Sequence, residues 1–159
     1  MGHGDDRWNS SNPSRRGIAK LTPQGKTVET PRRLARLYLV KAEQFAAEAG
    51  DALASSRYDA AMLNAVHAGI SASDAVCVAI GGRRSSDPDH QHAARLLEQT
   101  GGGSKEFSES AKRLRMLLGK KNAVEYESRV TSKSDATDAV KRAGRLVSWA
   151  GRIVDDARV

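Results

Sequence analysis

The chain has 159 residues, of which 39% are hydrophobic and only 4% aromatic, and its formal net charge is +7. A length of about 160 residues fits one domain with a real core. Because aromatic residues are scarce, aliphatic side chains and alanine must fill that core, which favours packed helices over a sheet. The single cysteine, Cys77, excludes an internal disulfide framework and a multi-cysteine zinc site, and indicates a cytoplasmic protein.

The N-terminal segment, residues 1–30, is polar and rich in Gly, Ser, Asn and Pro, without a periodic apolar pattern. This composition predicts a disordered tail. The segment is also basic, since residues 1–33 hold seven Lys or Arg against three Asp or Glu and so carry +4 of the net charge. No apolar segment follows these basic residues, so we expect no secretory signal. Residues 31–159 are expected to fold as one helical domain.

Apolar spacing predicts five helices, at about residues 30–55, about 57–80, 87 to about 99, around 107–118, and from 132 through at least 154. Four of the expected starts carry capping signals. Two have Thr or Asp directly before proline, Thr30–Pro31 and Asp87–Pro88, and two have Ser three residues before Asp, Ser56 with Asp59 and Ser132 with Asp135. The glycines of Gly101–Gly103 predict a connector before the fourth helix. Short connections favour antiparallel neighbours, so the expected fold class is all-α, an antiparallel bundle of about five helices.

The expected second helix is apolar nearly all round, which predicts a position at the centre of the bundle. Its apolar run approaches the length of a membrane span, but it contains polar residues that would be costly in lipid. Four of them, Asn64, His67, Ser71 and Asp74, follow each other at steps of three, four and three and share a sector of roughly 80°. A polar stripe on a buried helix needs partners, which neighbouring helices, a second subunit or a ligand can supply.

Basic residues are concentrated on the expected fourth helix and just after it. Between residues 112 and 121 there is no acidic residue and there are five basic ones: Lys112, Arg113, Arg115, Lys120 and Lys121. Contact with phosphate groups is one interpretation. A solvated face that complements the helix dipole is the other.

Several segments, taken in order and spacing, resemble the HEPN domain superfamily over about residues 34–156. They are residues 38–45, 57–61, 64–68 and 114–126. The resemblance implies a helical bundle that is commonly homodimeric. It also implies an RNA-related function: many such domains are metal-independent ribonucleases of toxin–antitoxin pairs or phage defence, and others are binding or scaffolding modules.

The catalytic signature of that family is Arg, a polar residue, three variable residues and His, with two copies facing each other across the dimer. Here Lys121, Asn122 and Tyr126 stand at those positions. Lysine keeps the positive charge but lacks the bidentate fork that grips phosphate. A tyrosine phenol, with a pKa of about 10, is a poor general base at neutral pH, so catalysis would need a perturbed Tyr126 or the recruitment of His67.

We therefore expect a homodimeric protein that binds RNA or a nucleotide. If it is catalytic, we expect a metal-independent ribonuclease. The resemblance also implies a nucleotidyltransferase-type antitoxin as its partner. Candidate catalytic residues are Lys121, Asn122, Tyr126 and His67, and candidate binding residues are Asn64, Ser71, Asp74, Arg115 and Lys120. No cofactor, metal or membrane is expected. The alternative is a non-catalytic interaction module whose basic tail contacts nucleic acid.

Weaker candidates were weighed beside these. Asp89, His90 and His92 lie together, but a His-x-His pair does not place both rings on one helical face, which speaks against a metal site. Cys77 lies among Ala, Val and Ile and is typical of a small packed hydrophobic residue.

Overall fold

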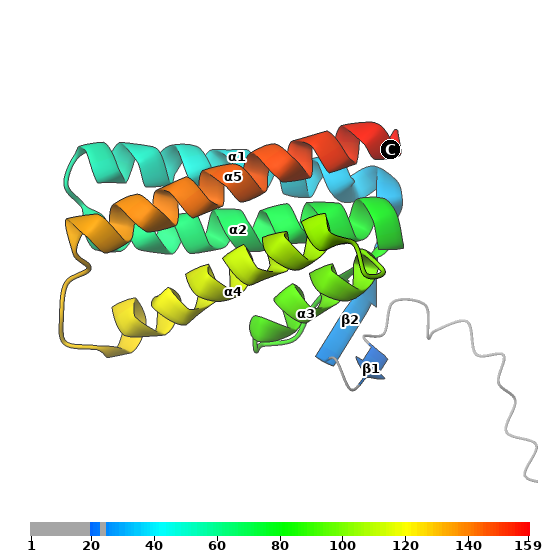
Figure 1. Ribbon diagram of the computed structural model, residues 1–159, viewed down its shortest axis with the longest axis horizontal. Coiled ribbons are helices and arrows are strands. Elements are labelled where there is room, and N and C mark those ends of the chain that lie inside the picture. Colours follow the sequence, from blue (N-terminus) through cyan, green and yellow to red (C-terminus); the bar gives the residue numbers. More distant parts are fainter. Residues whose placement is uncertain (1–19, 23–24) are drawn as a thin grey trace, which may run out of the picture.

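The computed structural model describes residues 20–22 and 25–159. Their α-helices are α1 (Ala35–Ala54), α2 (Tyr58–Gly81), α3 (Gln91–Thr100), α4 (Lys105–Tyr126) and α5 (Lys133–Ala157), and the short 3-10 helix η2 (Arg32–Leu34) precedes α1. Figure 1 shows the four long helices side by side, with α1 and α2 antiparallel and α4 and α5 antiparallel, and the short α3 beside α4. The predicted all-α bundle of five helices is confirmed.

Helix α2 is the centre of this bundle and packs against α1, α3, α4 and α5. Its buried residues are mostly Ala, Val and Ser, so its neighbours approach closely. At Gly69, an added Cβ would lie 2.9 Å from Leu117 Cδ1 of α4 and 3.5 Å from Leu146 Cδ1 of α5. Within the described residues, α2 alone is long and apolar enough to cross a membrane, but most of that stretch is buried inside the bundle. The prediction of a central, buried helix is confirmed.

Two helix starts show where local capping signals hold and where they fail. Ser132 caps α5 as predicted, since its Oγ accepts a hydrogen bond from the backbone N–H of Asp135 at 3.0 Å. The capping box predicted at Ser56 and Asp59 is wrong, because α2 has Arg57 as its N-cap and no side-chain cap. The Asp59 carboxylate instead accepts a hydrogen bond from the backbone N–H of Thr131 at 2.8 Å, which ties the α4–α5 connection to the start of α2.

A small antiparallel sheet, absent from the sequence-based expectation, lies at one end of the bundle. Its strands are β1 (Lys20–Thr22), β2 (Gly25–Glu29) and β3 (Arg83–Ser85), in the order β1-β2-β3. The predicted disordered tail is therefore wrong for the residues of β1 and β2. The rest of that tail up to residue 24, residues 1–19 and 23–24, lies outside the described residues. Composition favoured helices for the whole chain and did not indicate three short strands.

Strand β2 connects the N-terminal segment to the end of α2. The backbone N–H of Thr30 donates to the carbonyl of Gly82 at 2.8 Å, and the carbonyl of Lys26 accepts from the N–H of Ser86 at 3.0 Å. Thr30 therefore belongs to this junction and does not cap the first helix, whose 3-10 turn has Pro31 as N-cap without a side-chain cap. Arg32 Nε donates to the Ala79 carbonyl at 2.6 Å, which satisfies a carbonyl in the last turn of α2.

Candidate functional site

The C-terminal part of α4 lines an open pocket of about 280 Å³ together with the segment that precedes α3. Lys121, Asn122 and Tyr126 form its α4 side, and Asp89 and His90 lie on the opposite side. Tyr126 is the last residue of α4 and is 81% exposed. Three of the four predicted catalytic residues therefore share one pocket.

Lys121 is the cation of this pocket. Its Nζ lies 3.6 Å from Glu125 Oε1, one helical turn away, and its side chain is only 19% exposed. An i,i+4 pair of this kind stabilises a helix by about 0.2–0.5 kcal/mol, so the pair holds the lysine in place only weakly. The ammonium group therefore remains able to exchange the Glu125 carboxylate for a phosphate oxygen.

His67, the fourth predicted catalytic residue, lies on α2 and interacts electrostatically with this pair. Its ring stacks at a tilt on Phe45 of α1, with 5.3 Å between ring centroids and 32° between planes. Partial burial lowers the pKa of His67, the Lys121 ammonium lowers it further, and the Glu125 carboxylate opposes the shift. The imidazole of His67 is therefore mostly neutral at pH 7, the state that can accept a proton.

His90 is a member of the site that the sequence pattern did not single out for catalysis. It lines the same pocket as Lys121, and its pKa is lowered by partial burial, by the Lys121 ammonium and by His67. The local sequence suggested only a weak metal motif here. The proximity of His90 to Lys121 comes from the packing of the α3 entry against α4, which sequence spacing does not encode.

The remaining polar residues of α2 find most of their partners inside the chain. Asn64 Nδ2 donates to the Ala60 carbonyl of its own helix at 2.9 Å, and Ser71 is buried. Burial raises the pKa of Asp74 to about 7, while Arg84 and Lys41 oppose that rise. For Asn64 and Asp74 the partners are therefore the helix itself and charged groups of α1 and β3.

Two cations near Asp74 lie against the ring of Tyr38 on α1. Lys41 Nζ and Arg84 Cζ each lie 5.6 Å from the centroid of the Tyr38 ring, close enough for cation–π attraction. Tyr38, Lys41 and Arg84 were not singled out from the sequence. Arg84 and Tyr38 are far apart in the chain, and only the packing of β3 near α1 brings them together.

Two predicted binding residues point to other parts of the surface. Arg115 Nη2 forms a 2.6 Å ion pair with Glu98 Oε2 of α3, and this contact lowers the pKa of Glu98. Lys120 Nζ lies 3.8 Å from Asp135 Oδ1 at the start of α5. Consecutive residues on a helix point about 100° apart, so Lys120 and Lys121 serve different surfaces.

Metal-binding and thiol chemistry have little support in the described residues. No group of three His, Cys, Asp or Glu in residues 20–22 and 25–159 is arranged to hold a metal ion. His92 Nε2 lies 4.0 Å from Asp87 Oδ1 and 3.8 Å from Asp89 Oδ2, so these residues form ion-pair contacts. Cys77 is buried, and burial raises its pKa to about 12, which leaves the thiol protonated and unreactive at neutral pH.

Comparison with known families identifies the domain. The family model of the HEPN domain matches residues 35–153, from the first residue of α1 to near the end of α5. HEPN domains are in general associated with nucleotides and RNA. Comparison with curated proteins gives no match. Because the family model covers 119 of the 159 residues, the chain belongs to the HEPN domain family.

Proposed function

We propose that this HEPN protein binds RNA and cleaves it without a metal ion, as the family resemblance implies. The observation that carries the proposal is the position of Lys121. It shares one open pocket with Asn122 and Tyr126, and its ammonium lies near enough to His67 to lower the pKa of that imidazole. Lys121 thus links a neutral base, His67, to a pocket that also contains the Tyr126 hydroxyl.

The chemistry divides between His67 and Tyr126. Neutral His67 takes the proton of a ribose 2′-hydroxyl, the 2′ oxygen forms a bond to phosphorus, and the bond from phosphorus to the 5′ oxygen breaks. The Tyr126 hydroxyl donates its proton to the leaving 5′ oxygen and regains one from water, and His67 releases to water the proton that it took. Lys121 balances the charge of the phosphate during the step. The products are a 2′,3′-cyclic phosphate and a 5′-hydroxyl end.

This division of roles gives the tyrosine a function that suits it. A phenol is a poor base, but it carries a proton that an acid can donate. The base role passes to His67, whose lowered pKa keeps it unprotonated at pH 7. The replacement of the family histidine by Tyr126 is therefore compatible with cleavage.

The protein acts as a homodimer in this proposal. Tyr126, which lines the pocket, is 81% exposed, so the open side of the pocket presents an uncovered aromatic side chain. A second copy that faces this side would cover Tyr126 and bring two Lys121–Tyr126 segments to one cleft. Light scattering after size-exclusion chromatography should then give twice the 17.1 kDa of one chain. A monomer at all concentrations would contradict the dimer.

The cellular role that we propose is that of a cytoplasmic toxin or defence component, held in check by a nucleotidyltransferase-type antitoxin. The support is the family resemblance together with the cleavage site proposed above. Expression in a bacterial host should arrest growth, and His67→Gln should relieve the arrest. Equal growth with both forms would contradict this cellular role and would leave the proposed cleavage activity in vitro unaffected.

A cleavage assay tests the proposed activity. Labelled single-stranded RNA is incubated with the purified protein in EDTA. We expect Lys121→Met and His67→Gln each to lower the cleavage rate by about a hundredfold or more. Loss of a group that stabilises transition-state charge costs about 10²–10³, and a general base contributes about 10²–10⁴. Lys112→Met is the matched control, since Lys112 is an exposed lysine on the same helix outside the pocket, and its rate should stay within about twofold.

The product ends give a second readout of the same assay. A 2′,3′-cyclic phosphate is expected, since the proposed nucleophile is the ribose hydroxyl. If the wild-type protein cleaves no faster than Lys121→Met and His67→Gln, the enzymatic proposal is wrong. Salt-dependent RNA binding without cleavage would then favour the non-catalytic interaction module.

A further inference from the structure

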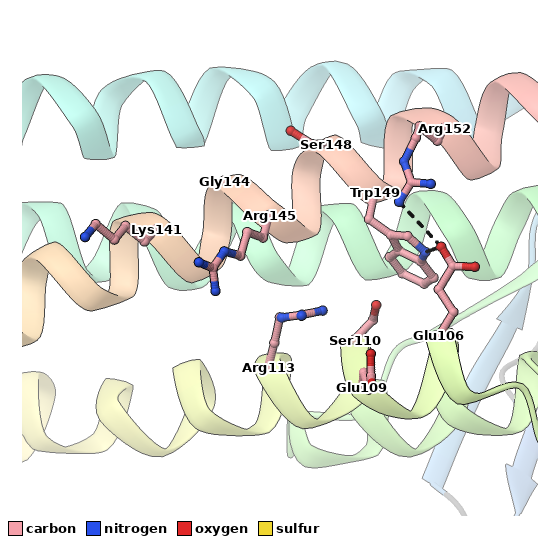
Figure 2. A pocket seen from close by; sticks show the side chains of 10 residues that line it. All are labelled: Glu106, Glu109, Ser110, Arg113, Lys141, Gly144, Arg145, Ser148, Trp149 and Arg152. Carbon is pink, nitrogen blue, oxygen red and sulfur yellow. Dashed lines mark hydrogen bonds and ion pairs between the residues drawn. The ribbon is translucent and has the colours of Figure 1, made fainter.

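A second concave surface lies between the first half of α4 and the second half of α5. It encloses about 650 Å³ and is lined by four basic and two acidic side chains. Figure 2 shows Arg113 of α4 and Arg145 of α5 reaching into the space between the two helices. We call this surface the α4–α5 groove. It lies on a different face of α4 from the pocket of Lys121, because the two share no residue.

Three cations of the α4–α5 groove lack an acidic partner. Within the part of the chain that the structure describes, Arg113, Lys141 and Arg145 have no carboxylate at ion-pair distance. The two acidic residues of the groove pair with other cations, Glu106 with Arg152 at the end of the groove at 3.5 Å and Glu109 with Lys105 at 3.9 Å. The positive charge in the middle of the groove is therefore uncompensated.

The other half of the same helix pair provides a comparison. A hollow of about 410 Å³ between the end of α4 and the start of α5 also contains four basic residues. There, each cation has a carboxylate within 4.0 Å, in the pairs Arg115–Glu98, Lys120–Asp135, Arg129–Glu127 and Arg142–Asp138. Unpaired cations are thus not a general property of the α4–α5 seam. They are concentrated in the α4–α5 groove, which indicates an anionic ligand from outside the chain.

The floor of the groove excludes recognition through base stacking. Trp149 is 5% exposed, its Nε1 donates to Glu106 Oε1 at 2.7 Å, and its ring meets Phe107 edge-to-face at 5.1 Å. The dashed contacts in Figure 2 show Glu106 held by both Trp149 and Arg152. An indole fixed in this way cannot stack on a base. No exposed apolar side chain lines the groove to enter a lipid layer either, so the available contacts are charged and polar.

The length of the cationic row favours a polymer over a single anion. Lys141, Arg145 and Arg152 lie on one side of α5, and the eleven steps of 1.5 Å from Lys141 to Arg152 span about 16 Å. Arg152, at the end of this row, already contacts Glu106. Arg113 adds a cation from the opposite wall. A free phosphate would occupy one part of such a row, whereas a chain of phosphodiesters can contact the row along its length. Guanidinium groups also match the paired oxygens of a phosphate in geometry.

Gly144 leaves the middle of the groove open. It lies on α5 beside Arg145, and a Cβ built on it meets no atom within 4 Å. A side chain can therefore be placed at this position without a clash in the fold. A substitution at Gly144 can therefore change the charge of the groove without disturbing the packing of the helices.

We propose that the α4–α5 groove binds the phosphodiester backbone of a nucleic acid, independently of base sequence, through Arg113, Lys141 and Arg145. This inference rests on the proposed RNA function and deepens it. The substrate is an RNA long enough to contact the groove as well as the pocket of Lys121, and the groove supplies affinity while the pocket supplies chemistry.

The test introduces a negatively charged or a neutral side chain at Gly144. Affinity is measured by fluorescence anisotropy with a labelled 20-nucleotide RNA over a series of salt concentrations. Gly144→Glu should weaken binding at least about tenfold, and Gly144→Gln, which has the same shape without charge, should stay within about threefold. Arg113→Gln with Arg145→Gln should reduce the steepness of the salt dependence by about 1.4, since each single-strand phosphate contact adds about 0.7.

Matched controls separate a local effect from a general one. Gly151→Glu adds the same charge to α5 outside the groove, also at a position where an added Cβ meets nothing within 4 Å. It should weaken binding by less than about threefold, and circular dichroism should show every variant folded. A 20-nucleotide DNA should bind with similar affinity, because the backbone is what the groove contacts. If poly-glutamate of equal charge competes as well as RNA, the groove is a site for acidic protein and the assignment is wrong.

Failure of this inference can be told apart from failure of the proposed function. Cleavage of a dinucleotide, too short to reach the groove, should be unchanged in Gly144→Glu and lost in His67→Gln. If long RNA binds Gly144→Glu and the wild type equally well, the groove proposal is wrong whatever the cleavage assay gives. If no form cleaves RNA but Gly144→Glu still weakens binding, the groove stands and the ribonuclease proposal fails.

Discussion

The fold strongly alters the ionisation of Asp74. Its carboxyl group is half-buried on α2, and burial raises its pKa to about 7 against the opposing charges of Arg84 and Lys41. The same carboxylate contributes to the raised pKa of Cys77 below it. In an unfolded chain an aspartate has a pKa of about 4. The native protein therefore holds this proton more tightly than the unfolded chain does.

Stability should accordingly depend on pH through Asp74. Between about pH 4 and pH 7 the unfolded state loses this proton first, so the contribution of Asp74 falls as pH rises, by up to about 4 kcal/mol for three units. We expect Asp74→Asn, which cannot ionise, to gain stability relative to the wild type as pH rises from 5 to 8. Urea unfolding of both proteins at several pH values measures this difference. A difference that stays constant with pH would show that the carboxyl group is not shifted in this way.

His67 offers a second test at the scale of single residues, because Lys121 and Glu125 act on it with opposite signs. Removing the cation with Lys121→Met should raise the pKa of His67, and removing the anion with Glu125→Gln should lower it. Titration of the His67 ring by NMR measures both. Lys112→Met serves as the control and should leave the pKa of His67 unchanged. Shifts of the same sign in both variants would contradict the geometry of the site.

Among the elements, helices were predicted more completely than strands because their signals are local. The apolar periodicity of α1 and α5 and the Ser132 cap lie within single segments of the sequence. Strand β2, by contrast, forms by pairing with β3, with Thr27 opposite Ser85. Neither three-residue β3 nor the polar β2 has a pattern that indicates a strand by itself. Their pairing depends on where α2 ends.

The basic stretch of α4 shows the same limit for the candidate site. Sequence alone found the charge run and placed Lys121, Asn122 and Tyr126 together, since these residues are close in the chain. It could not show that the run divides among three surfaces: Arg113 in the α4–α5 groove, Arg115 and Lys120 in ion pairs with α3 and α5, and Lys121 in the pocket. Nor could it bring His90 to Lys121, which depends on packing between elements.

The close approach of α2 to α4 and α5 makes a prediction at the scale of elements. A Cβ at Gly69 must displace Leu117, and a larger side chain would also press on Leu114 and Leu146, which lie 3.4 and 3.5 Å from that Cβ. Gly69→Leu should therefore lower the free energy of unfolding by about 1–3 kcal/mol, the usual cost of overpacking a core. Gly119→Leu on α4 is the matched control, since an added Cβ there meets nothing within 4 Å. Urea unfolding followed by circular dichroism compares the two, and equal stability would contradict the packing.

At the scale of the whole molecule, the positive charge is spread more widely than the run of basic residues suggests. Of the +4 carried by residues 1–33, residues 1–19 contribute only +1, from three arginines against two aspartates. The other +3 lies in residues 20–33, within and beside the sheet and η2. The α4–α5 groove adds a net +2 from four cations and two carboxylates. A nucleic acid therefore meets cations on the folded part of the molecule as well as in the N-terminal segment.

This distribution decides how the contribution of the N-terminal segment should be tested. Deleting residues 1–30 would remove β2 and its hydrogen bonds to Gly82 and Ser86, and so would change the fold and the charge together. Deleting residues 1–19 removes only +1 and leaves β1 and β2 in the chain. If the folded domain provides the RNA contacts, this shorter deletion should change the affinity for a 20-nucleotide RNA by less than about threefold. The salt dependence should lose no more than about one phosphate contact.

Gly144→Glu in the full-length chain provides the comparison, because it changes the charge of the folded domain by a single unit. If the folded domain provides the RNA contacts, this one substitution should reduce the affinity for RNA more than the deletion of nineteen residues does. The reverse order, with a loss of more than tenfold on deleting residues 1–19, would mean that the N-terminal segment dominates binding. Binding would then follow the alternative in which the basic N-terminal segment contacts nucleic acid, since the three arginines of residues 1–19 would outweigh the cations that the fold brings together between α4 and α5.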